Sequence, residues 1–183
     1  MRTNYLLVSV SVLVLAFGIA VADPHARGGE LVYGGGVSFA LKAPTGWVLD
    51  AKSGRDQGMD AVYYAKGSSF GEARVIAYAH ALPKHNQTIA QLIDQTVATM
   101  REHASQLVVD PTSAMTCGNN KSGRLLTVSH DPVGNAEALV FLDEADAVIV
   151  LGLIANDESH RTTAMPKLRE LCSTYRFVGP VTH

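Results

Sequence analysis

Four polar side chains are of the types that a metal-dependent site would need. His80 and His85 are close enough in sequence to share the mouth of one loop, and His130 is followed by Asp131. Two imidazoles and a carboxylate can bind Zn²⁺ or Cu²⁺ when loops bring them together. Their spacing matches no metal-binding motif, so we predict solvated residues at the ends of elements. A small metal-dependent hydrolase, assembled from loops around these four residues, is the alternative.

Three neighbouring carboxylates, Asp143, Glu144 and Asp146, form the densest acidic cluster of the chain. Carboxylate oxygens suit Ca²⁺, but the segment lacks the ligand count and the central glycine of a calcium-binding loop. A polar hairpin turn explains these three residues better. Glycines 34–36 are not followed by the Gly-Lys-Ser/Thr of a phosphate-binding loop. The sequence therefore predicts no catalytic, cofactor-binding or metal-binding residue.

Cys117 and Cys172 are the only two cysteines. In an oxidising compartment, an even pair that is distant in sequence indicates a disulfide. Closing a loop of about 55 residues would stabilise the fold by roughly 4 kcal/mol. The alternative is a pair of separate buried thiols that behave as small hydrophobic side chains.

Aromatic side chains could form a recognition surface in the first half of the chain. Trp47, Tyr63 and Tyr64 are the candidates for a binding surface, because tryptophan and tyrosine dominate the energetically important contacts of interfaces. Such rings more often complete the core around a sheet, and this is the favoured interpretation.

The N-terminal segment has the features of an export signal. Arg2 supplies a positive charge, and residues 6–21 are apolar and slightly shorter than the roughly 20 residues of a membrane-spanning helix. Ala22 ends a small-x-small site, so we predict a signal peptide over residues 1–22 that is cleaved before Asp23. Retention of this segment as a membrane anchor is the alternative.

Cleavage would leave about 160 residues, enough for one domain with its own core. Removing Arg2 leaves 14 basic against 17 acidic residues, a net charge of −3. The charges are scattered without a basic stripe, which excludes nucleic acid and anionic membranes as expected partners. We predict a flexible lead-in at 23–36, a single domain at 37–178 and a tail at 179–183.

Periodicity divides this domain into strands and two helices. Alternating or wholly apolar runs predict strands at 37–41, 47–49, 61–65, 73–81, 124–129, 137–142 and 147–155, with weaker candidates at 107–109 and before Cys117. A helical stripe begins after Thr88, and a second one runs from 158 to 175. Pro166 inside the second stripe predicts a kink or a restart. Short polar links favour antiparallel pairing, and the very apolar run 147–155 is expected at the centre. The fold class is therefore α+β.

The strand VSFALKAP followed by TGW, the apolar strand AVIVLGLIA and the final helix with MPKLRELCSTYRF resemble the PsbP/Mog-like superfamily. The resemblance covers residues 37–178. It implies a three-layer α-β-α sandwich around a mostly antiparallel sheet, and a non-enzymatic accessory or binding role. Members look like photosystem II assembly factors, regulators that bind the GTPase Ran, or bacterial envelope proteins of the DcrB type. The export signal favours the envelope branch, and no functional residue of the family can be carried over.

These observations predict an exported, periplasmic or extracellular protein that binds another envelope or secreted protein without catalysis or cofactor. Besides the hydrolase, an inhibitor or immunity protein that neutralises a secreted enzyme is a further alternative. An interface built on Trp47 and the tyrosines would favour that alternative.

Overall fold

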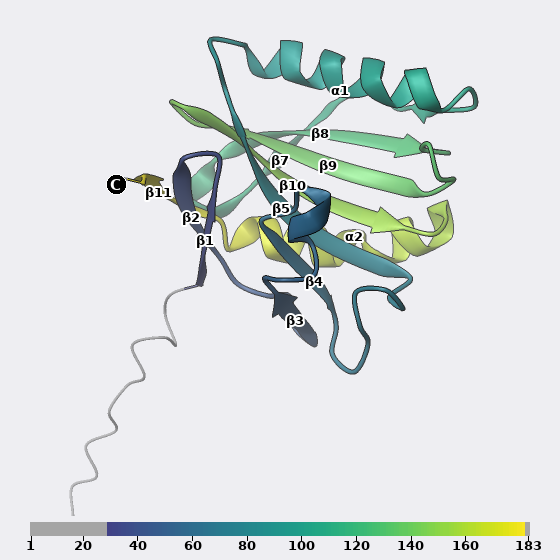
Figure 1. Ribbon diagram of the computed structural model, residues 1–183, viewed down its shortest axis with the longest axis horizontal. Coiled ribbons are helices and arrows are strands. Elements are labelled where there is room, and N and C mark those ends of the chain that lie inside the picture. The colour runs from purple at the N-terminus through teal and green to yellow at the C-terminus, as the bar shows by residue number, and fades with distance from the viewer. Residues whose placement is uncertain (1–28, 182–183) are drawn as a thin grey trace, which may run out of the picture.

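The computed structural model describes residues 29–181, which fold into two sheets and two helices (Figure 1). The strands are β1 (Glu30–Gly34), β2 (Val37–Leu41), β3 (Trp47–Asp50), β4 (Ala61–Ala65), β5 (Val75–Pro83), β6 (Val108–Val109), β7 (Ser113–Thr116), β8 (Ser122–Ser129), β9 (Ala136–Asp143), β10 (Ala147–Ala155) and β11 (Arg176–Pro180). The helices are α1 (Ile89–His103) and α2 (Glu158–Ser173), with short 3₁₀ turns η2 (Arg55–Gln57) and η3 (Gly118–Asn120).

The larger sheet is antiparallel and has eight strands, in the order β3-β4-β5-β10-β9-β8-β6, with β7 also pairing with β8. β10 lies in the middle, as its wholly apolar sequence predicts, because both of its faces are covered. The antiparallel pairing and the central position are therefore confirmed.

The two helices cover opposite faces of this sheet, which gives three layers (Figure 1). Alternate residues of β9 show the division: Ala138 and Val140 belong to the core cluster that contains α2, and Leu139 and Phe141 belong to the cluster that contains α1. We call these the α2 face and the α1 face. The predicted α-β-α sandwich is confirmed.

Each helix begins at a side-chain cap. The Thr88 hydroxyl accepts from the backbone N–H of Gln91, and the Gln91 side chain accepts from the backbone N–H of Thr88, which forms a capping box for α1. Asp157 caps α2. Pro166 lies inside α2, which runs on from Glu158 without restarting at the proline.

A second, three-stranded sheet has the order β1-β2-β11 and contains part of the predicted lead-in. The expectation of a loose segment at 23–36 is wrong for β1, which pairs with β2 through a tight turn at Gly35 and Gly36. Both glycines have positive φ, 55° and 79°, which suits the turn of a two-residue hairpin. β11 likewise extends into the predicted tail 179–183.

The predicted signal peptide, with its cleavage site between Ala22 and Asp23, lies outside the described residues. Within residues 29–181, no helix is both long and apolar enough to cross a membrane.

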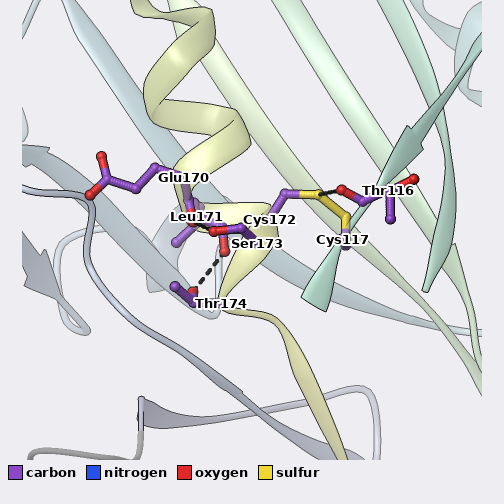
Figure 2. The surroundings of a disulfide bond; sticks show 7 residues. All are labelled: Thr116, Cys117, Glu170, Leu171, Cys172, Ser173 and Thr174. Carbon is purple, nitrogen blue, oxygen red and sulfur yellow. Dashed lines mark hydrogen bonds between the residues drawn. A yellow bond between two sulfur atoms is a disulfide. The ribbon is translucent and has the colours of Figure 1, made fainter. Parts of the chain in front are cut away.

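The predicted disulfide between Cys117 and Cys172 is present. It joins the last turn of α2 to the segment between β7 and η3 (Figure 2). Beside it, Gly118 approaches the Tyr175 backbone so closely that a Cβ atom would lie 2.1 Å from the carbonyl oxygen. The Thr174 hydroxyl donates to the Leu171 carbonyl at 2.7 Å and closes the helix end. The C-terminal end of α2 is thus fixed from several sides.

Candidate functional site

The three aromatic residues considered as a binding surface do not lie together. Tyr63 is fully buried in the core on the α2 face, in agreement with the favoured interpretation of a core residue, so it cannot belong to a binding surface. Tyr64 points to the other face, because neighbours in a strand alternate, and its hydroxyl donates to Asp50 at 3.0 Å. Trp47 is half-buried against the core of the α2 face and lines a concave surface.

A tight turn positions Trp47 at the start of β3. The Trp47 N–H donates to the Pro44 carbonyl at 2.8 Å, and Gly46 has φ of 78°, which is typical of the third position of a type II turn. A residue with a side chain would be strained at that φ. The sequence TGW therefore fixes the direction in which the indole leaves the backbone.

Side chains of α2 hold this turn in place. The Glu170 carboxylate accepts from the N–H and the hydroxyl of Thr45, at 2.7 and 2.5 Å, and Lys167 Nζ donates to the Thr45 carbonyl at 2.7 Å. The hydrogen bonds from Thr45 and the neighbouring Lys167 lower the pKa of Glu170. Since the clamp joins two segments more than 120 residues apart, it fixes Trp47 relative to α2.

A cleft of about 490 Å³ lies between Trp47 and the first turns of α2; we call it the Trp47 cleft. Its other walls come from β4, the start of β5 and the loop between them, and its polar side chains are Ser68, Arg74, Ser159, His160 and Thr163. Its volume falls in the range of sites that hold small organic molecules.

The ionisable side chains of the Trp47 cleft are basic. His160 Nδ1 lies 2.7 Å from Asp157 Oδ2, and the hydrogen bonds from His160 lower the pKa of Asp157. Arg74 makes no ion pair and no side-chain hydrogen bond with residues 29–181, although its carbonyl accepts from the Asn156 N–H at 3.1 Å. The cleft is therefore lined by an arginine without a side-chain partner among residues 29–181 and by an imidazole that Asp157 orients.

The four residues of the alternative metal site are far apart. His80 lies on β5 and its Nδ1 is 3.3 Å from Asp60 Oδ2, without hydrogen-bond geometry between the two atoms. His85 follows the end of β5 that pairs with Ala147, whereas His130 and Asp131 lie at the opposite end of the sheet. Nine-residue strands separate these two ends by roughly 25 Å. The hypothesis of a site shared by these loops is therefore wrong.

Asp131 has a structural role in the turn between β8 and β9. Its carboxylate accepts from the backbone N–H groups of Val133 and Asn135, at 2.9 and 2.7 Å. Glu137 lies beside it, and both are only 7% exposed. Burial, together with the neighbouring Asp131 carboxyl group, raises the pKa of Glu137 to about 8.

The acidic cluster 143–146 is a hairpin turn in which two of the three carboxylates pair with lysines. Lys84 Nζ lies 2.6 Å from Asp143, and Lys121 Nζ lies 3.0 Å from Glu144, which also accepts from the Tyr175 hydroxyl at 2.9 Å. Across residues 29–181, no group of three His, Cys, Asp or Glu side chains is arranged to hold a metal ion.

Sequence reasoning missed Arg74 and His160, because each stands alone in its own segment. It also missed the segment 67–71, GSSFG, which matches the Gly-x-Ser-x-Gly spacing of hydrolase nucleophiles. That motif needs a turn between a strand and a helix, whereas this segment links β4 to β5, and the Ser69 hydroxyl donates to Glu72 at 2.8 Å.

The fold and the cleft together define an α+β sandwich protein with an open cleft beside Trp47. LpqN of Mycobacterium tuberculosis, described as involved in cell envelope biogenesis, is 17% identical and superposes with a TM-score of 0.51 over 76% of this chain and 83% of its own. PA94 of Pseudomonas aeruginosa, described as a protein of unknown function, is 9% identical, with a TM-score of 0.50 over 84% of this chain and 98% of its own.

The solution structure of cyanobacterial PsbP from Synechocystis is 13% identical, with a TM-score of 0.49 over 87% of this chain and 96% of its own. No family model matches the chain, and no curated protein is similar to it in sequence. LpqN and PA94, at TM-scores of 0.50 or above, show that solved structures share the α+β fold of this chain.

Proposed function

We propose that this chain is an exported binding protein of the cell envelope, which holds its ligand or partner in the Trp47 cleft without catalysis. The observation that carries the proposal is the combination of a rigidly held tryptophan with an unpaired arginine in one concave site. Tryptophan and arginine are the residues that contribute most to binding when they lie in such surroundings.

Two further observations support export. Residues 1–22 have the pattern of a cleaved signal peptide, and the disulfide between Cys117 and Cys172 is of the kind that persists in oxidising compartments. The fold is shared with LpqN, a protein described as involved in cell envelope biogenesis.

Site-specific photocrosslinking in the producing cells tests this proposal. A photoreactive side chain at Thr163, which is exposed and lines the Trp47 cleft, should capture a molecule of the envelope, and mass spectrometry should find Asp23 at the mature N-terminus. The matched control carries the same side chain at Thr162, which is exposed on α2 and is not among the residues that line the cleft. A protein adduct and a small-molecule adduct at Thr163 would both support the proposal. Equal labelling at both positions, or an uncleaved cytoplasmic chain, would refute it.

Ester hydrolysis is a second candidate, favoured by one observation: Ser68 lines the same cleft as His160, whose ring is oriented by Asp157. This is the order of groups in a serine hydrolase. Against it, the Ser68 hydroxyl donates to the Ser69 carbonyl at 3.4 Å. Covalent labelling of Ser68 by a fluorophosphonate, lost in His160→Ala, would establish catalysis and overturn the non-catalytic proposal. No labelling would support binding alone.

A further inference from the structure

We propose that the Trp47 cleft binds a small organic anion, with its acid group at Arg74 and His160 and its apolar body against the indole. This inference rests on the proposed function and adds the chemical class of the ligand.

The first argument is charge. Arg74 and His160 are the ionisable side chains among the residues that line the cleft, and no carboxylate lines it. The acidic residues at the start of α2 already have partners: Asp157 lies 2.7 Å from His160, and Glu158 accepts from Arg161 at 3.1 Å. The Arg74 guanidinium has no such partner within the described part of the chain, so an acid group of a ligand can take that place.

The second argument is the hydrogen-bonding capacity of the Arg74 and His160 side chains. A guanidinium presents donors in a planar fork that matches the two oxygens of a carboxylate or phosphate. Asp157 occupies His160 Nδ1, which leaves Nε2 as the ring nitrogen for a ligand. The hydroxyls of Ser159 and Thr163 also line this wall and can donate to an acid group.

The third argument is the shape of the opposite wall. Trp47 is half-buried, and the clamp of Thr45 and Glu170 holds its backbone in place. The exposed face of the indole is therefore a rigid apolar surface. A side chain that is already rigid loses little conformational entropy when a ligand contacts it. An inorganic anion would leave the indole face exposed to solvent, so an anion with an apolar or ring-shaped body fits the cleft better.

Trp47 allows a direct test, because it is the only tryptophan of the chain and its emission reports on the cleft alone. The exported protein is titrated with benzoate and phenyl phosphate, with their neutral counterpart benzamide and with inorganic phosphate. We expect the two organic anions to change the emission saturably, with dissociation constants in about the millimolar range or tighter. Benzamide and inorganic phosphate should bind at least about tenfold more weakly, since each lacks one of the two contacts.

Substitutions test whether the change in Trp47 emission comes from binding in the cleft. Arg74→Gln should weaken binding of benzoate at least about tenfold, and His160→Asn should weaken it about threefold. Arg101→Gln, an exposed arginine on α1, is the matched control and should leave binding unchanged. Equal binding of benzoate and benzamide, an equal effect of Arg74→Gln and Arg101→Gln, or no saturable change with either organic anion would overturn the inference. If photocrosslinking at Thr163 still succeeds in that case, the proposed function stands and only the ligand class is wrong.

Discussion

The two faces of the large sheet are held to their helices by different interactions. On the α2 face, the helix is joined to the rest of the chain by the disulfide at Cys172 and by the clamp between Glu170 and Thr45. Arg161 adds hydrogen bonds from α2 to the carbonyls of Val128 and Glu137, at 3.0 and 3.4 Å. The buried leucines of this helix complete a core that includes the second sheet.

On the α1 face, the helix is held by apolar packing. Leu92, Ile93 and Val97 are its buried residues, and within residues 29–181 no side-chain hydrogen bond or ion pair joins α1 to the sheet. Apolar contacts are non-directional, whereas hydrogen bonds and a disulfide fix geometry. We infer that the α2 face is the rigid one, which is why a preorganised cleft is built there.

Removal of the disulfide, which joins α2 to the segment after β7, should have the largest effect on stability. We expect the double substitution Cys117→Ala and Cys172→Ala to lower the free energy of unfolding by about 4 kcal/mol, because the open loop gains conformational freedom in the unfolded chain. Urea denaturation monitored by circular dichroism measures this loss. A loss below about 1 kcal/mol would contradict this contribution of the disulfide to stability.

Equivalent truncations on the two helices compare the faces directly. Leu168 on α2 is fully buried and Leu92 on α1 is 8% exposed. We expect Leu168→Ala to cost about 3–4 kcal/mol and Leu92→Ala about 2 kcal/mol, because the cavity under α1 can collapse more easily. Equal costs in urea denaturation, or the reverse order, would contradict the difference in rigidity.

A change of pH should weaken the α1 face. Glu137 shares that face with Leu139, and the folded protein retains its proton up to about pH 8, whereas the unfolded chain releases it near the usual value of 4.5. Between these values the folded state binds more protons, so stability falls as the pH rises. We expect a loss of about 2 kcal/mol from pH 5 to pH 8, less than the full shift implies because the end of the hairpin can admit water. Denaturation of Glu137→Gln should show no such slope, and a parallel slope in both proteins would contradict the assignment.

The clamp on Trp47 should have the smallest effect on stability. We expect Glu170→Ala to cost about 1 kcal/mol, because it removes hydrogen bonds that are partly exposed. It should also shift the Trp47 emission to longer wavelength, as water reaches the indole. Glu102→Ala, at an exposed glutamate of α1, is the control and should change neither quantity. If both variants leave the emission unchanged, the clamp does not position Trp47.

Local patterns predicted the larger part of the fold. The apolar run of β10, the stripes of both helices and the cysteine pair each express a constraint that acts within one segment or between two matching residues. β1 escaped prediction because it is short and flanked by glycines, and its pairing with β2 is a contact between two segments rather than a pattern within one.

The cleft could not be predicted in the same way. Trp47, Arg74 and His160 come from three segments that no local pattern connects, and only the pairing of β3, β4 and β5 with α2 above them brings these residues together. The placement of Tyr63 and Tyr64 on one binding surface failed for a simpler reason. Adjacent residues of a strand point to opposite faces, so two neighbouring tyrosines cannot share one surface.

Native-state hydrogen exchange tests the difference between the two faces most directly. If α1 is held by apolar packing alone, the amides of Leu92, Ile93 and Val97 should exchange through an opening that costs less free energy than global unfolding. The amides of Leu168 and Leu171 in α2, and those of β10, should exchange only when the whole domain unfolds. Equal protection of α1 and α2, or lower protection of α2, would contradict the account.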